Sequence, residues 1–224
     1  MRLTLRISHL FLPILILILL AGSLTAQLYK PHWQLAGDEQ KRYGIEKGKI
    51  TYIFTGNARG TEIVVFDHWG WREKRDTDKS TTTWGNTAEQ KSTSVQDGNY
   101  VITHPHGSKI ARAGQDWEIN RSLEKSSKAV EVYHAEEVLK HKGAVKVRTE
   151  YMLGRDCDVY ENKNFSMTIW VWKGIIIKSE QVALENKIVM ECTKVDPEID
   201  FTDQNFALPE GVEITGLPNA AGNE

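Results

Sequence analysis

Cysteine and proline are scarce in this sequence, and the short motifs of common enzyme active sites are missing. Of 224 residues only two are cysteine and six are proline. The chain has no Gly-x-Ser-x-Gly elbow, no His-Glu-x-x-His pair and no phosphate-binding glycine loop. The sequence therefore predicts a protein that is not an enzyme, although an envelope enzyme with an unrecognised motif stays a third possibility.

A strong net charge and a long basic run are missing too. Lys and Arg number 28 against 30 Asp and Glu, which gives a formal net charge of -2 at pH 7. A weakly acidic protein has no electrostatic attraction to the phosphates of nucleic acid, so we expect no nucleic-acid partner. The charge-rich stretch WREKRDTDKS, residues 71–80, is interpreted as a solvated edge or turn.

The chain begins with Arg2 and Arg6, then an apolar core over residues 10–21, then small residues. This pattern is typical of a secretory signal peptide, which we place at residues 1–26. A retained membrane anchor is the alternative, but Pro13 interrupts the core, which is shorter than the roughly 20 residues of a spanning helix. We expect an exported, periplasmic protein with no stable membrane span after cleavage.

The rest of the chain is predicted to be one β-rich domain over residues 27–214, followed by a flexible tail over residues 215–224. Alternating apolar residues predict strands, for example at Lys49–Gly56 and Thr61–Gly70. Helical spacing of apolar residues predicts one helix over Ser126–Gly143. The pattern as a whole favours a mainly β (α+β) fold, with about eight to ten antiparallel strands and few helices.

One predicted hairpin, FSMTIWVWKGIIIKSE, is apolar on both of its faces. A two-residue Lys-Gly turn would place Trp172 opposite Ile175 and Trp170 opposite Ile177, so these four side chains would share one face. An antiparallel strand with one wet face should alternate more cleanly. Either protein covers both faces, or one face binds a ligand. The second face carries Met167, Ile169, Val171 and Ile176.

Four segments carry a resemblance to a known group of proteins: GTEIVVFDHWGWRE, LGRDCDVYE, IWVWKGIIIKSE and FALPEGVEI. In this order they resemble uncharacterised exported bacterial proteins, a domain of unknown function that is related in fold to the lipoprotein carriers LolA and LolB. The resemblance spans Lys49 to Ile214 and includes no catalytic signature. It implies a strongly curved antiparallel sheet, or half-barrel, with one or a few helices across its opening and an apolar cavity between.

The cavity of the carriers takes the acyl chains of lipoproteins, and the resemblance extends that expectation to this chain. We expect a non-enzymatic binding or carrier protein with an apolar groove for a lipid, a lipoprotein acyl chain or a similar hydrophobic ligand. The alternative is a filled core, which would make the chain a structural or protein-interaction domain of the cell envelope. The candidate groove residues are Trp170, Trp172, Ile175, Ile177, Phe54, Val64 and Phe66.

Two further residue pairs have a possible chemical role. Cys157 and Cys192 are candidates for a disulfide in an oxidising compartment, or for two separate buried thiols. His104 and His106 alternate in an extended segment, but two ligands are too few for a metal ion. We therefore expect no metal site, no catalytic residue and no cofactor.

Overall fold

The computed structural model describes residues 41–97, 100–115, 134–183 and 186–216. The signal peptide predicted at residues 1–26 and most of the predicted tail lie outside these ranges. All the described residues belong to one unit, His32–Leu217. Among them, no helix combines the length and the apolar character needed to cross a membrane.

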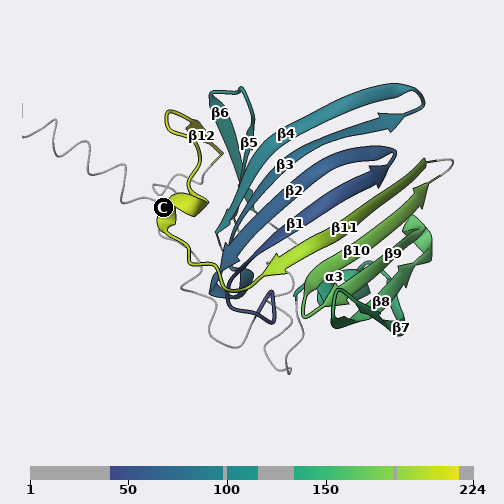
Figure 1. Ribbon diagram of the computed structural model, residues 1–224. Coiled ribbons are helices and arrows are strands. Elements are labelled where there is room, and N and C mark those ends of the chain that lie inside the picture. Colours follow the sequence, from purple (N-terminus) through teal and green to yellow (C-terminus); the bar gives the residue numbers. More distant parts are fainter. Residues whose placement is uncertain (1–40, 98–99, 116–133, 184–185, 217–224) are drawn as a thin grey trace, which may run out of the picture. The chain divides into compact units, whose positions relative to one another are not determined.

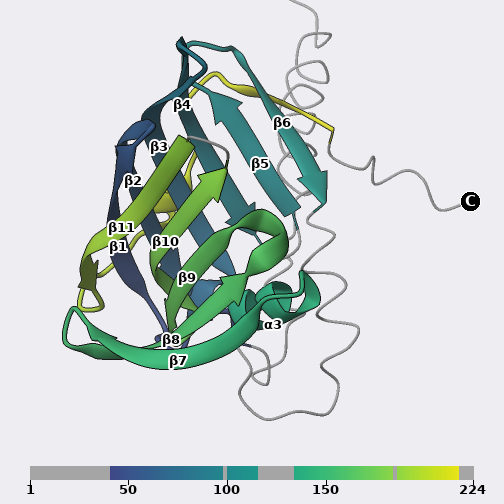
Figure 2. The ribbon, with the colours of Figure 1, turned by 90° about the vertical axis from the view of Figure 1, so that its right-hand side faces the viewer.

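Strands dominate this unit and form a single curved sheet (Figures 1 and 2). The sheet has twelve strands in the order β12-β6-β5-β4-β3-β2-β1-β11-β10-β9-β8-β7. All neighbours are antiparallel except β12 and β6, which are parallel. The predicted mainly β fold with a curved antiparallel sheet is therefore confirmed.

The strands of the N-terminal half are β1 (Gly48–Gly56), β2 (Ala58–Asp67), β3 (Arg72–Thr83), β4 (Asn86–Asp97), β5 (Tyr100–Pro105) and β6 (Ile110–Gln115). Those of the C-terminal half are β7 (Val145–Met152), β8 (Arg155–Asn162), β9 (Met167–Trp172), β10 (Ile175–Ala183), β11 (Asn186–Asp196) and β12 (Glu213–Thr215). The pairing of β1 with β11 joins the two halves. Short 3-10 helices are η2 (His68–Gly70), η3 (Lys163–Phe165) and η4 (Asp203–Phe206).

The strand count exceeds the expected eight to ten, in part because the long strand β3 carries no apolar residue. Strand β3 has the sequence REKRDTDKSTTT, and β4 has NTAEQKSTSVQD. The interpretation of residues 71–80 as a solvated edge or turn was wrong, since β3 lies in the interior of the sheet between β2 and β4. Backbone pairing over ten positions with β2 and twelve with β4 holds it there despite its polar composition.

Helix α3 (His134–His141) follows the N-terminal half of the sheet. It matches the later part of the predicted helix, whereas residues 126–133 lie outside the described ranges. Leu139 packs in a cluster with Tyr160, Ile169 and Val171, so α3 covers β8 and β9. Gly143, at a φ of 84°, ends the helical segment in the left-handed conformation that favours glycine.

The hairpin formed by β9 and β10 differs from its predicted register at one position. Trp172 lies opposite Ile175, as predicted, but Trp170 lies opposite Lys178, because the register shifts between Ile176 and Lys178. Ile177 is thus the extra residue of a β-bulge, which an alternation pattern does not mark. The predicted pairing of Trp170 with Ile177 was therefore wrong.

Candidate functional site

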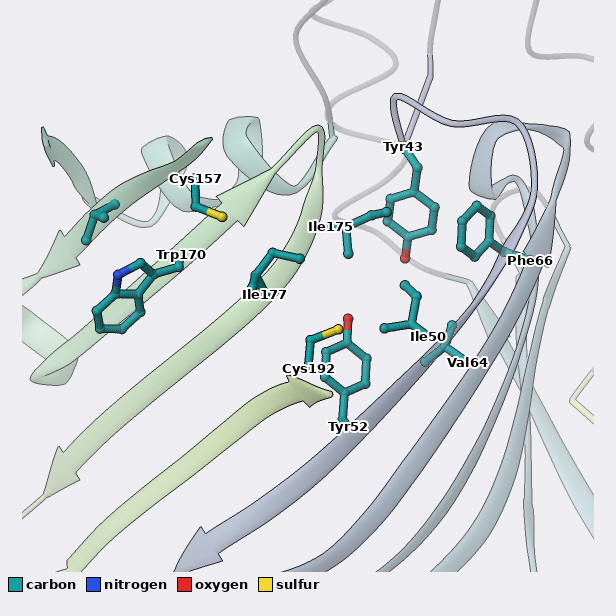
Figure 3. Close-up of a cluster of buried hydrophobic side chains, with 11 residues drawn as sticks. Tyr43, Ile50, Tyr52, Val64, Phe66, Cys157, Trp170, Ile175, Ile177 and Cys192 are labelled. Atoms are coloured by element: carbon teal, nitrogen blue, oxygen red, sulfur yellow. The ribbon is translucent and has the colours of Figure 1, made fainter. Parts of the chain in front are cut away.

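The larger group of buried apolar side chains, which we call the apolar cluster, joins the hairpin to β1 and β2 (Figure 3). Of the seven candidate groove residues, Trp170, Ile175, Ile177, Val64 and Phe66 belong to it, and Trp172 packs against it. Phe54 is buried outside the cluster, with the Lys79 ammonium 4.7 Å from its ring centroid. The other members are Tyr43, Ile50, Tyr52, Cys157, Val159 and Cys192.

Tyr43 reaches the apolar cluster from the segment before β1, which the sequence patterns did not single out. Its ring meets Phe66 edge to face, with centroids 4.6 Å apart. The backbone N–H of Tyr43 donates to the carbonyl of Trp69 at 3.0 Å, and that of Gly44 donates to the carbonyl of Lys173 at 2.8 Å. These bonds tie the segment both to η2 and to the hairpin turn.

A second group, which we call the charged cluster, consists of Glu62, Glu73 and Arg75. Arg75 Nη1 donates to Glu62 Oε1 at 2.5 Å, and Arg75 Nη2 donates to Glu73 Oε1 at 2.9 Å. The side chains of Glu62 and Glu73 are only 7% and 5% exposed, whereas that of Arg75 is 36% exposed. The guanidinium therefore holds two buried carboxylates while part of it still meets solvent.

The two clusters lie side by side on one face of the sheet. Residues directly opposite each other in an antiparallel ladder share a face. Ile50 lies opposite Val64, and Val64 lies opposite Arg75. One step along the strands, Tyr52 lies opposite Glu62. The face therefore changes from apolar to charged between β1 and β3.

Next to Arg75, β4 and β5 place uncharged polar side chains on the same face. Arg75 lies opposite Ser94 of β4, which lies opposite Thr103 of β5, and the two hydroxyls are 3.2 Å apart. Glu73 lies opposite Gln96, which is 7% exposed. Thr77 donates to Glu62 Oε2 at 2.9 Å. The face thus passes from aliphatic and aromatic groups through ions to hydroxyls and amides.

Tyr43 links the apolar cluster to the charged cluster through its hydroxyl, which donates to Glu73 Oε2 at 2.5 Å. Burial alone would raise the pKa of the Glu73 carboxyl. The positive charges of Arg75 and Arg42, with the hydrogen bond from Tyr43, outweigh burial, so the pKa lies below its usual value. Burial, reinforced by the negative charge of Glu73, raises the pKa of the Tyr43 hydroxyl. We therefore expect an ionised Glu73 and a neutral Tyr43 at neutral pH.

Arg42 adds a second cation beside Glu73. Its Nη1 donates to the carbonyl of Gly70 at 2.6 Å, and the side chain lies near the Tyr43 ring, 5.5 Å from its centroid. Its Nε is buried and has no hydrogen-bond partner within the described part of the chain. Two arginines therefore face two glutamates in this region, which keeps the buried charge balanced.

The sequence patterns missed the charged cluster, but the alternation within β3 contains a signal for it. Glu73, Arg75 and Thr77 occupy every second position, so they share one face of a strand. The sequence alone indicates that such a polar face is exposed to solvent, because the neighbouring strands are not known. Only the pairing with Phe66 and Val64 of β2 reveals that the charges adjoin the apolar cluster.

Both cysteines are buried and free in the structure. They belong to the apolar cluster, and each thiol lies near a carbonyl of its own strand, Cys157 near Arg155 and Cys192 near Lys194, at 3.7 and 3.4 Å. Burial raises the pKa of both thiols, which keeps them protonated and weakly nucleophilic. Of the two alternatives for this pair, the structure has the one with separate buried thiols.

The two histidines lie apart from the apolar and charged clusters. His104 is buried and its Nε2 lies 2.8 Å from the Ser108 carbonyl oxygen, while His106 Nε2 lies 3.0 Å from Thr93 Oγ1. Across the described ranges, no group of three or more His, Cys, Asp or Glu side chains is arranged to hold a metal ion.

Comparison with known proteins gives matches among solved structures. No protein-family model and no curated protein matches the sequence. An uncharacterised conserved protein from Thermus thermophilus shares 6% identity, with 75% of this chain and 89% of that chain covered and a TM-score of 0.48. The structure of MucB shares 11% identity, with 84% and 67% covered and a TM-score of 0.42.

The similar structures include a LolA superfamily protein, NE2245 from Nitrosomonas europaea. It shares 8% identity, with 75% of this chain and 92% of that chain covered and a TM-score of 0.26. The chemistry of the face between β1 and β5 has to be argued from this chain's own residues.

Proposed function

We propose that this chain is an exported, non-enzymatic binding or carrier protein for an amphipathic ligand, such as a lipid or a lipoprotein acyl chain. The apolar cluster would contact the hydrocarbon part, and the charged cluster would contact the polar end. Export to the periplasm is part of the proposal, and the sequence pattern of residues 1–26 supports it. That the seven candidate residues line an apolar groove is also part of the proposal.

The observation that carries the proposal is that the two clusters adjoin on one face, where Val64 lies opposite Arg75. A buried ion group contributes little to stability, since the same volume filled with apolar side chains is often equally stable or more so. Its retention beside an apolar cluster therefore favours a role in recognition. A protein that only needed a core would gain nothing from Glu62 and Glu73 at this place.

The exposed part of Arg75 indicates what a ligand could contact. The guanidinium has five N–H donors in a planar fork, and two of its nitrogens already serve Glu62 and Glu73. The remaining donors suit a phosphate, carboxylate or ester oxygen at the polar end of a lipid. Because the carboxylates offset its charge, we expect hydrogen bonding rather than net charge to decide recognition.

Tryptophan fluorescence tests the proposal. Trp172 packs against the apolar cluster, whereas Trp84 is 80% exposed on the turn between β3 and β4. We expect a fatty acid carrying bromine atoms to quench the fluorescence in a saturable way. Trp172→Phe should remove much of that quenching, and the matched variant Trp84→Phe should leave it unchanged. No quenching of the folded protein at any fatty acid concentration would sink the proposal.

A second test looks for ligand bound in the cell. The protein purified from its native envelope should release a lipid into organic solvent, and mass spectrometry should identify it in a fixed ratio to protein. Arg75→Met should lower that ratio. A protein free of lipid, with unquenched tryptophans, would instead support the other candidate function.

That other candidate is a structural or protein-interaction domain with a filled core, and one observation favours it. Val64, Phe66, Ile175 and Ile177 have 0% exposure, so protein atoms alone surround them. In a filled core Ile177→Ala should cost about 2–5 kcal/mol of unfolding free energy. A ligand-binding wall should lose less stability and more binding, so urea unfolding and fatty acid titration of this one variant separate the two functions.

A further inference from the structure

Strand β7 forms one end of the sheet and pairs on one side only, with β8. Within the described ranges no strand pairs with its outer side. Such an edge is a ready template for pairing with another chain. Large apolar side chains are exposed along it, with Val147 at 45% and Tyr151 at 74%. The unpaired edge of β7 therefore exposes apolar side chains as well as backbone groups.

The hairpin turn fixes which backbone groups of β7 point outward. Leu153 and Gly154 form a two-residue turn, so Met152 and Arg155 close the ladder as a pair. In such a hairpin the closing pair exchanges hydrogen bonds, and bonded and non-bonded pairs then alternate. Glu150 and Arg148 therefore direct their N–H and C=O groups toward β8. The N–H and C=O groups of Thr149 and Tyr151 point away from the sheet.

Only a few registers would pair these outward groups with those of a second β7 strand. An antiparallel pair around a two-fold axis must have one residue opposite its own copy. An axis at Arg148 sets two like charges opposite each other, and so does an axis at Glu150, which disfavours both. An axis at Thr149 sets Arg148 opposite Glu150 of the other copy, twice.

The same Thr149 register also matches the apolar residues. It sets Val147 opposite Tyr151 of the other copy, so these two exposed apolar side chains would cover each other. Arg148 already bonds Glu150 within its own chain at 2.5 Å. Two arginines and two glutamates would therefore alternate around the two-fold axis. Such a network is more favourable than isolated surface pairs.

We propose that β7 is an interface for a second copy of this chain, paired antiparallel with Thr149 on the two-fold axis. A register shift between Lys146 and Arg148 marks a bulge in β7 at Val147. The bulge limits the contact to residues 147–151 of each copy, with Val147 at its irregular end, so the contact is short. The expected product is a two-fold dimer with one continuous sheet.

Disulfide trapping tests the register. Opposite residues of a bonded antiparallel pair have Cα atoms about 5.5 Å apart, which lies within the range that a disulfide spans. Thr149→Cys should therefore form a covalent dimer under mild oxidation. Both native cysteines are buried, so background cross-linking should be low. The control is Val182→Cys, at a 46% exposed position of β10, which lies inside the sheet and should cross-link at least tenfold more slowly.

A charge exchange tests the partner. Arg148→Glu alone and Glu150→Arg alone each set like charges opposite one another, so each variant should be monomeric in sedimentation at concentrations where the wild type is dimeric. An equimolar mixture of the two variants restores both opposite-charge contacts and should dimerise. Circular dichroism of each variant verifies its fold, since Glu150 also accepts a hydrogen bond from Trp170.

Three results would overturn the proposal. One is a wild-type protein that sediments as a monomer at all concentrations up to the millimolar range. This result would refute the dimer even if β7 pairs with a different protein. A second is a mixture of folded charge variants that stays monomeric while the wild type dimerises, because the dimer would then use another surface. Equal cross-linking rates for Thr149→Cys and Val182→Cys would likewise refute the Thr149 register.

Discussion

Removal of the Arg75 guanidinium is the sharpest test of the charged cluster. In Arg75→Met a side chain of similar length remains, but the Glu62 and Glu73 carboxylates lose their shared partner. Both carboxylates are nearly inaccessible, with side-chain exposures of 7% and 5%. A buried charge that loses its partner cannot recover its hydration, so the loss should destabilise the fold.

The size of the effect follows from the geometry. Two charges about 4 Å apart attract by about 4 kcal/mol at an effective dielectric of 20, and removing one member of a buried pair costs about 3–5 kcal/mol. The lower end applies, because Arg75 is 36% exposed and water screens part of its charge. We expect Arg75→Met to lower the unfolding free energy by about 3 kcal/mol at neutral pH.

The loss should depend on pH with a definite sign. In the wild type the Glu73 pKa is lowered, so this group stabilises the fold above its unfolded pKa, and that contribution is lost as the pH falls through the folded pKa. Without Arg75, burial would raise the carboxyl pKa instead, and protonation would then stabilise the folded variant. The difference between variant and wild type should therefore shrink as the pH falls from 7 toward 4.

Urea unfolding followed by circular dichroism at several pH values measures this difference. Lys194→Met is the matched control, since Lys194 bonds Asp196 at 2.7 Å on an exposed strand position and should lose no measurable stability. The triple replacement Glu62→Gln, Glu73→Gln and Arg75→Met removes all three charges and should recover most of the lost stability. A loss below about 1 kcal/mol, or one independent of pH, would refute the assignment of a buried charged cluster.

Three further substitutions test single contacts. Gly70→Ala should destabilise the protein more than Gly85→Ala in thermal unfolding. Both positions have positive φ, but only at Gly70 would the new Cβ meet a ring, that of Tyr43 at 2.4 Å. Equal losses of stability would contradict this. Glu136→Gln should stabilise the protein at pH 8 and not at pH 4. Burial raises the pKa of the Glu136 carboxyl, so ionisation of this group costs stability as the pH rises. An effect independent of pH would disprove this explanation. Asn162→Ala should cost about 1–3 kcal/mol in urea, since its buried amide donates to a carbonyl at 2.8 Å and accepts from two N–H groups; no loss would count against it.

Much of the apolar part of the fold could be predicted from the sequence. Strands β1, β2, β9 and β10 carry β-branched and aromatic residues in runs bounded by glycine, and such runs indicate strands wherever they pair. The turn at Lys173 and Gly174 was predicted from residue type alone. Both residues have positive φ, 48° and 77°, as this turn requires.

The charged part could not be predicted, because its meaning depends on partners distant in sequence. Arg75 and Glu62 are 13 positions apart and meet only through the pairing of β2 with β3. A local pattern of alternating charges fits a solvated strand equally well. The bulge at Ile177 was missed for a related reason, since it is a change of register between β10 and β9, whereas β10 and β11 keep a single register.

The hairpin's two apolar faces now have separate explanations. Ile169 and Val171 pack against the helix residue Leu139, so one face is covered by α3 and needs no ligand. Trp170 and Ile177 belong to the apolar cluster, whose far side continues through β1 to the charged cluster. An apolar hairpin by itself therefore argues for burial only. The case for a ligand depends on Arg75, because a core needs no ion there and an amphipathic lipid does.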